Sequence, residues 1–304
     1  MSKNQLQTEF EYPEIDLSIK PETDCDNEWL KQVKVGTSVR EFEYVELLEV
    51  AVRVGCPGNC IKYCPQEIML NAYANKQPRY MRLSDFKRIL STVPRHVYLD
   101  FAGLTEPFSN PEFLDMAEYA NKEGFQYGVK TTFLGASADD VKRLSTLSPC
   151  CVFVHMPDFV HLNFKPTQQY VDAWFACLKY IRNAQYMTMN NLFATNSREV
   201  TARGQARTRS GFGQCYRRDH PQMLVFPNGE TVICCIDIKM ENVVGNLLVN
   251  SYANVRANFL SKHTYPICAS CSYNVSVPHY YMRKIIRKVG PKIVRATSLW
   301  KEHV

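Results

Sequence analysis

Short apolar runs alternate with longer amphipathic stretches through the middle of this chain of 304 residues. Apolar runs bounded by polar residues favour strands, and apolar residues at helical spacing favour helices. Strands are predicted at residues 44–54, 96–102, 126–132, 150–155 and 186–194. Helices are predicted at residues 84–90, 110–124, 137–147 and 167–181. The alternation predicts an α/β fold, a partial (β/α) TIM-type barrel of parallel strands with its site at the carboxyl ends of the strands.

The pattern changes after residue 195, where arginines and glycines form an irregular, basic connector. Farther on, Met223–Cys234 predicts a β-hairpin around an Asn-Gly turn, with a helix to follow. At the other end, Pro13 and Pro21 interrupt a polar arm. The sequence therefore predicts four segments: an N-terminal arm at 1–40, the barrel at 41–200, a small hairpin-plus-helix domain at 201–275 and a basic tail at 276–304.

Charge and hydropathy narrow the class of protein. The net charge of +6 is modest, and part of it falls in the tail between Arg283 and Lys301. A solvated helical face explains that run better than an anionic partner, and no nucleic-acid motif accompanies it. No apolar run approaches the ~18 residues of a membrane span, and Met1–Glu9 lacks an apolar leader. We therefore expect a cytoplasmic protein without a transmembrane segment. It has 12 cysteines, and we expect those that cluster at ligand spacings to bind metals rather than form disulfides.

Three of those cysteines, Cys56, Cys60 and Cys64, stand within nine residues, directly after the first predicted strand. Three thiolates on one loop can hold three irons of a 4Fe-4S cluster and leave the fourth iron open to an outside ligand. Zinc normally takes four ligands, so this loop would need a fourth from a distant residue. Local spacing favours an iron-sulfur cluster over a zinc site or a set of unrelated buried thiols.

A second set of cysteines lies in the C-terminal region. The predicted hairpin brings Cys234 beside Cys215, and Cys268 and Cys271 follow as a Cys-x-x-Cys pair. Together they make a four-thiolate cage, which on spacing alone could hold zinc or an iron-sulfur cluster. Cys235 could replace Cys234, because neighbouring residues of a strand point to opposite faces.

The first loop resembles the cluster loop of radical S-adenosylmethionine (radical SAM) enzymes, in which the amino and carboxylate groups of SAM chelate the open iron. Tyr63 before the last cysteine matches, but the second gap has three residues, where the family usually has two. After the second predicted strand, Gly103, Glu106 and Pro107 resemble the family's Gly-Gly-Glu-Pro segment, with the second glycine replaced. The resemblance implies that this backbone and the Glu106 carboxylate hold the amino group of SAM.

Further residues are assigned by position in the same family pattern. The turn after the third predicted strand resembles the family's Thr-Asn-Gly turn, which implies that Thr132 lines the SAM site. His155 ends the fourth strand and could orient substrate or exchange a proton, or it could be a hydrogen-bonded histidine at a strand edge. Arg198, after the fifth strand, could meet a carboxylate of SAM or of the substrate.

The C-terminal region resembles the auxiliary-cluster extensions called SPASM and twitch. The resemblance rests on the Pro-Asn-Gly hairpin and on the segment Gly245–Leu247 before the next helix. No cysteine follows Cys271, so it implies a single, twitch-like auxiliary 4Fe-4S cluster, held by Cys215, Cys234, Cys268 and Cys271.

The resemblance implies an enzyme that reductively cleaves SAM to a 5′-deoxyadenosyl radical. The radical would abstract hydrogen from a peptide or carbohydrate-like substrate, the auxiliary cluster would aid electron transfer, and flavodoxin or ferredoxin would serve as reductant. The competing hypothesis is a non-catalytic metal-binding protein with zinc in the C-terminal cage. Methyl transfer from SAM is a third.

Overall fold

The structure is a computed structural model, and it describes most of the barrel and parts of the C-terminal region. The described residues are 46–57, 66–103, 105–156, 166–188, 213–215, 221–262, 265–270 and 274–276, with Pro278 and Tyr281. The predicted arm, Cys60, Cys64, Arg198 and Cys271 lie outside them.

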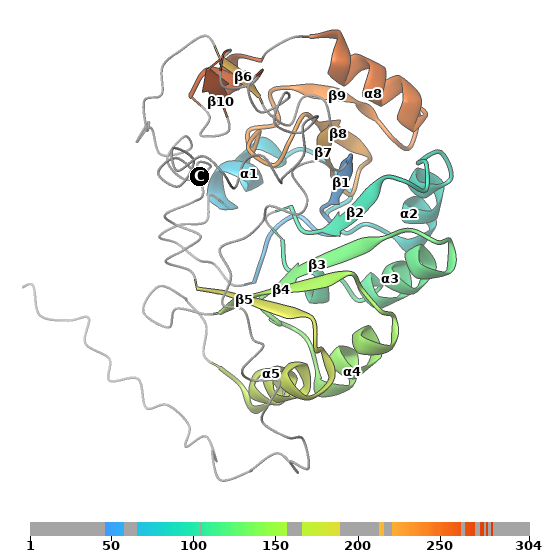
Figure 1. Cartoon of the computed structure of the whole chain (residues 1–304), viewed down its shortest axis with the longest axis vertical. Helices are drawn as coiled ribbons and strands as arrows, with labels where there is room; N and C mark the ends of the chain where they lie inside the picture. Colours follow the sequence, from blue (N-terminus) through green and yellow to red (C-terminus); the bar gives the residue numbers. More distant parts are fainter. Residues whose placement is uncertain are drawn as a thin grey trace, which may run out of the picture.

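One mixed sheet organises the described chain (Figure 1). Its strand order is β5-β4-β3-β2-β1-β7-β8-β9, and the first six strands of that order are parallel. The strands are β1 (Leu47–Val50), β2 (Tyr98–Phe101), β3 (Tyr127–Thr131), β4 (Cys151–Met156), β5 (Ala184–Thr188), β7 (Gln222–Val225), β8 (Glu230–Val232) and β9 (Val243–Asn246). The predicted α/β fold with parallel strands is confirmed, and the sheet does not close on itself, which is consistent with the predicted partial barrel.

Helices α2 to α5 follow the parallel strands and lie along one side of the sheet (Figure 1). Two of them begin as their sequences indicate: Ser137 and Asp140 form a capping box at α4, and Thr167 caps α5. The helices are α1 (Gln66–Ala72), α2 (Leu83–Leu90), α3 (Phe113–Lys122), α4 (Ala138–Thr146), α5 (Gln168–Tyr180) and α8 (Tyr252–Ser261), with 3-10 turns η3 (Pro107–Ser109) and η4 (Pro266–Ser270). Within the described part of the chain, no helix is both long and apolar enough to cross a bilayer.

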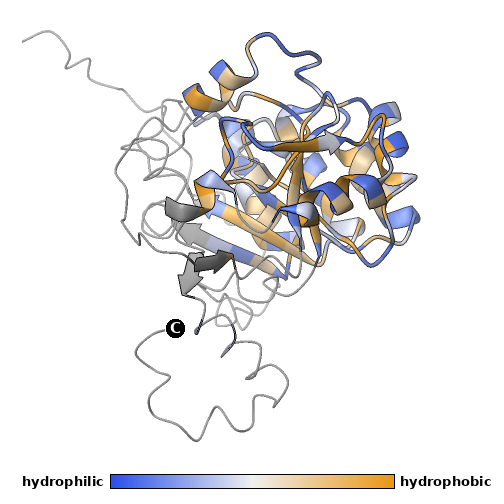
Figure 2. Cartoon of the chain, turned by 90° about the horizontal axis from the view of Figure 1, so that it is seen from above, coloured by the Kyte–Doolittle hydropathy of each residue, from blue (hydrophilic) through white to orange (hydrophobic). Residues whose placement is uncertain are grey.

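The main core lies between the sheet and these helices. Leu48, Leu99, Val129 and Val152 come from four adjacent strands and share one buried cluster with apolar residues of the helices. Figure 2 shows the same division, with apolar residues gathered inside and polar residues around the periphery. Because side chains alternate along a strand, the residues directly before and after each of these positions point to the opposite face of the sheet.

The predicted C-terminal hairpin is present, and it also extends the main sheet. β7 and β8 are antiparallel, and Gly229 has a φ of 80° in the turn between them. β7 pairs in parallel with β1, so the strand nearest to the cluster loop has one neighbour from each half of the chain. A second, two-stranded sheet pairs β6 (Gly213–Cys215) with β10 (Asn274–Ser276).

Candidate functional site

Four of the predicted site residues lie where adjacent parallel strands end. Cys56 follows β1, Gly103 and Glu106 follow β2, and Thr132 follows β3. Since β1, β2 and β3 are neighbours in register, their carboxyl ends meet at one edge of the sheet. His155 lies within β4, beside Met187 of β5.

The start of the cluster loop is fixed by the helix that follows it. The Cys56 backbone N–H donates a hydrogen bond to Gln66 Oε1 at 3.3 Å, and Gln66 is the buried first residue of α1. Cys56 is half-buried and forms no disulfide. Helix α1, which has seven residues, was not among the predicted helices.

Gly103 lies in close contact with residues of the neighbouring strands. Its φ is 86°, and a Cβ here would come within 2.7 Å of Leu224 Cδ1 and 3.1 Å of Ala51 Cβ. Its N–H donates to Glu49 Oε1 at 3.0 Å. Only glycine combines this backbone conformation with this approach, so the loop after β2 lies directly on β1 and β7.

Glu106 is buried and binds the end of β3. Its Oε1 accepts from Thr131 Oγ1 at 2.7 Å and from the Phe108 N–H at 3.2 Å. Its Oε2 accepts from the N–H and the Oγ1 of Thr132, both at 2.7 Å. Burial raises the pKa of the Glu106 carboxyl above its usual value, and it outweighs the hydrogen bonds from Thr131, Thr132 and Phe108, which lower the pKa. The carboxylate therefore joins two of the loops that the sequence assigns to SAM.

A row of charged residues crosses the sheet face opposite the helices, one layer below these loops. Glu49 and Asp100 are register neighbours and are both 4% exposed. Lys130 of β3 lies on the same face and forms an ion pair with Asp100. Burial lowers the pKa of the Lys130 ammonium, but the Asp100 and Glu49 carboxylates outweigh it and hold the pKa above its usual value.

The sequence reasoning missed this row, although it carries a signal. Glu49, Asp100 and Lys130 are single charged residues inside short apolar strands, at positions where a sheet covered on both faces would hold apolar side chains. Strand alternation places His155 on the same face as Phe153, the register neighbour of Lys130. His155 is half-buried.

The C-terminal cysteines occupy different surroundings. Cys215 lies on β6, and Cys268 lies in η4, which contacts both β6 and β10. Cys234 follows β8 and, like Cys268, packs against the main core. Cys235 is buried in a separate apolar cluster with Leu224 and acts on the pKa of Lys130.

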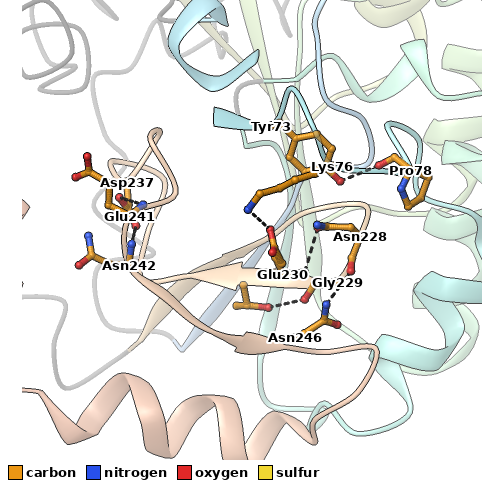
Figure 3. A network of polar contacts seen from close by, with 11 residues as sticks. Tyr73, Lys76, Pro78, Asn228, Gly229, Glu230, Asp237, Glu241, Asn242 and Asn246 are labelled. Atoms are coloured by element: carbon orange, nitrogen blue, oxygen red, sulfur yellow. Dashed lines mark hydrogen bonds and ion pairs between the residues drawn. The ribbon is translucent and has the colours of Figure 1, made fainter. Parts of the chain in front are cut away.

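The polar contacts around the hairpin connect it to the barrel (Figure 3). Asn246 Nδ2 donates to the Asn228 carbonyl at 2.9 Å, and Lys76, just after α1, pairs with Glu230 of β8 at 2.5 Å. Farther along, buried Asp237 accepts from the backbone N–H groups of Glu241 and Asn242. Among the described residues, no three histidine, cysteine or acidic side chains lie close enough together to hold a metal ion.

Comparison with known proteins identifies solved structures with a similar fold. No protein-family model and no curated protein sequence matches the chain. Among solved structures, BtrN in complex with AdoMet and 2-DOIA superposes with a TM-score of 0.52 and 15% identity, covering 71% of this chain and 85% of BtrN. The chain has a fold similar to that of BtrN.

A second structure of the same protein agrees with the first. Selenomethionine BtrN in an open conformation gives a TM-score of 0.50 at 12% identity, covering 75% of this chain and 92% of BtrN. Native anSMEcpe with bound AdoMet is a weaker match, with a TM-score of 0.44. At these identities the likeness to BtrN is one of fold.

Proposed function

We propose that the chain is a radical SAM enzyme that reductively cleaves SAM and uses the 5′-deoxyadenosyl radical to abstract hydrogen from a peptide or carbohydrate-like substrate. One observation carries the proposal: Cys56 at the start of the cluster loop, Gly103 and Glu106 after β2, and the Thr131–Gly135 turn lie at the carboxyl ends of neighbouring parallel strands. The likeness to BtrN, which was solved with AdoMet, supports it.

The residues present fit the groups that this function needs. Cys56 offers a half-buried thiol at the start of the cluster loop, and its backbone N–H donates to Gln66 Oε1 of α1. Cys60 and Cys64 would complete the set of thiolates for a 4Fe-4S cluster, which supplies an electron to SAM. In the Gly103–Pro107 loop, Thr105 Oγ1 is buried and has no hydrogen-bond partner among the described residues. A polar ligand at this loop would give that hydroxyl a partner.

The substrate would lie next to SAM, over the face of the sheet opposite the helices. The charged row of Glu49, Asp100 and Lys130, together with His155, gives that face a polar character that suits a polar substrate. Lys130 does not suit the role of a proton acceptor, because the carboxylates beside it favour its charged form. His155 remains the residue proposed to orient substrate or exchange a proton.

The auxiliary 4Fe-4S cluster would be held by Cys215, Cys234, Cys268 and Cys271, and would aid electron transfer. Cys234 suits this set better than Cys235, since Cys234 packs on the same core as Cys268 and Cys235 is buried elsewhere. A flavodoxin or a ferredoxin would supply the reducing electron.

Anaerobic reconstitution tests the proposal. Iron and sulfide are measured, the electron paramagnetic resonance spectrum of the reduced protein is recorded with and without SAM, and 5′-deoxyadenosine is quantified after addition of dithionite. We expect about eight irons per chain and a spectrum that SAM changes. Zinc with little iron and no response to SAM would refute the proposal and favour the non-catalytic metal-binding protein.

A further inference from the structure

Glu106 makes a different use of its carboxylate from the one that the family pattern implies. A carboxylate accepts about four hydrogen bonds, and the bonds from Phe108, Thr131 and Thr132 already number four. The residue is 1% exposed. An ammonium group of a ligand could therefore bind Glu106 only by displacing one of these protein donors.

The turn that Glu106 holds has an unfavourable backbone conformation. Phe133 is buried at a φ of 63°, a region that bulky residues rarely occupy. The Phe133 N–H donates to Thr131 Oγ1 at 2.7 Å, and the same hydroxyl donates to Glu106. The ring of Phe133 packs against Phe108 and Trp174. Such a conformation persists only when several surrounding contacts stabilise it, and the hydrogen bond between Glu106 and Thr131 is one of these contacts.

Thr105, the residue before Glu106, has a hydroxyl group whose hydrogen-bonding capacity is unused by the described residues. Thr105 Oγ1 is buried, and within the described chain nothing donates to it or accepts from it. Buried polar atoms are usually satisfied, so one that lacks a partner calls for an explanation, such as a bound ligand. A hydroxyl oxygen can accept a hydrogen bond from an ammonium group.

We infer that Glu106 is a positioning residue that shapes the Thr131–Gly135 turn, and that Thr105 is the side chain in this loop that contacts the amino group of SAM. The inference rests on the proposed function only in naming SAM as the ligand. The role of Glu106 can be measured without SAM.

Two isosteric substitutions separate the roles. Thr131→Val removes the hydroxyl that links Phe133 to Glu106, and Thr105→Val removes a hydroxyl that has no partner. In reconstituted full-length protein without SAM, we expect Thr131→Val to increase the equilibrium constant of unfolding about tenfold. We expect Thr105→Val to leave it unchanged or to lower it, because an unsatisfied polar group is lost.

Glu106→Gln gives an independent test of the carboxylate. Whichever way the amide is turned, its NH2 group faces the backbone N–H of either Phe108 or Thr132. We expect at least a tenfold increase in the unfolding constant, and a loss in the Glu106→Gln/Thr131→Val double variant smaller than the sum of the single losses. Glu112→Gln is the matched control, because its carboxylate accepts from the Leu83 N–H outside these loops.

The dissociation constant of SAM, measured well below the unfolding transition, completes the experiment. Thr105→Val should weaken binding about tenfold, the cost of one hydrogen bond to a charged group. Thr131→Val and Glu106→Gln should weaken it non-additively, and Glu112→Gln should not change it. The inference is overturned if Thr105→Val binds SAM like the wild type, or if Glu106→Gln loses SAM without losing stability. Wild-type protein that does not bind SAM would instead refute the proposed function.

Discussion

Lys130→Met should destabilise the protein most strongly near neutral pH. The substitution removes the ammonium but keeps most of the side-chain volume, so the neighbouring buried carboxylates of Asp100 and Glu49 lose the charge that Lys130 supplies. Removing one partner of a fully buried ion pair costs about 3–5 kcal/mol. The Lys130 side chain is 28% exposed, so solvent screening reduces that figure, and we expect about 2 kcal/mol.

The dependence on pH gives the effect a signature. The folded state raises the pKa of Lys130, so the ion pair stabilises the fold below about pH 10.4, the ordinary value for lysine. That contribution is lost as the pH rises through the folded-state value. At low pH the two carboxylates of the variant take up protons, which removes the uncompensated charge. The difference between wild type and variant should therefore be largest near neutral pH and shrink at both extremes.

Urea unfolding of the reconstituted protein, followed by circular dichroism between about pH 3 and pH 11, measures this difference, because carboxyl groups take up protons near about pH 4 and the contribution of Lys130 declines above about pH 10.4. With a slope of about 2 kcal/mol per molar urea, the midpoint should fall by about 1 M at pH 7. Lys122→Met is the matched control, because Lys122 pairs with Glu118 on the surface and is 71% exposed. A Lys130→Met midpoint equal to that of the wild type, or a shift that does not vary with pH, would refute the reasoning.

Further predictions concern the clusters and the loop after β2. Replacing Cys56 or either of the other two loop cysteines with alanine should abolish SAM cleavage while iron remains in the C-terminal site; unchanged 5′-deoxyadenosine formation in all three variants would contradict the assignment. Cys234→Ala should lose more iron than Cys235→Ala, and equal losses by iron analysis would contradict the choice of ligand. Gly103→Ala should cost about 1–3 kcal/mol in urea unfolding, because its Cβ would crowd Leu224 at a strained φ, and a stability like that of the wild type would show that the loop can move away.

The sequence predicted those parts of the fold that depend on local pattern. The strands at Tyr98–Phe101 and Tyr127–Thr131 are short apolar runs, and the structure places both within the predicted ranges. The hairpin turn at Asn228–Gly229 was predictable because it needs a residue at positive φ. In each case a few consecutive residues carry the whole signal.

Pairing over long sequence separation was not predictable in this way. The sequence indicated a hairpin at β7 and β8, but nothing local shows that Gln222–Val225 lies beside Leu47–Val50. The charged row was not predictable for the same reason. Each of its members is an isolated polar residue in the sequence, and only the strand register brings them together. The assignment of Glu106 also came from its place in a motif, and its bonds to Thr131 and Thr132 depend on the packing of two loops.

The cluster loop therefore depends on both halves of the chain. Cys56 follows β1, which has β2 on one side and the C-terminal β7 on the other. The ion pair between Lys76 and Glu230 joins the segment after α1 to the hairpin, and Gly103 lies against Leu224 of β7. Because β7 and β8 support β1, and the same hairpin leads into Cys234 and Cys235, any shift of the hairpin would act on the cluster loop and on the proposed auxiliary site together.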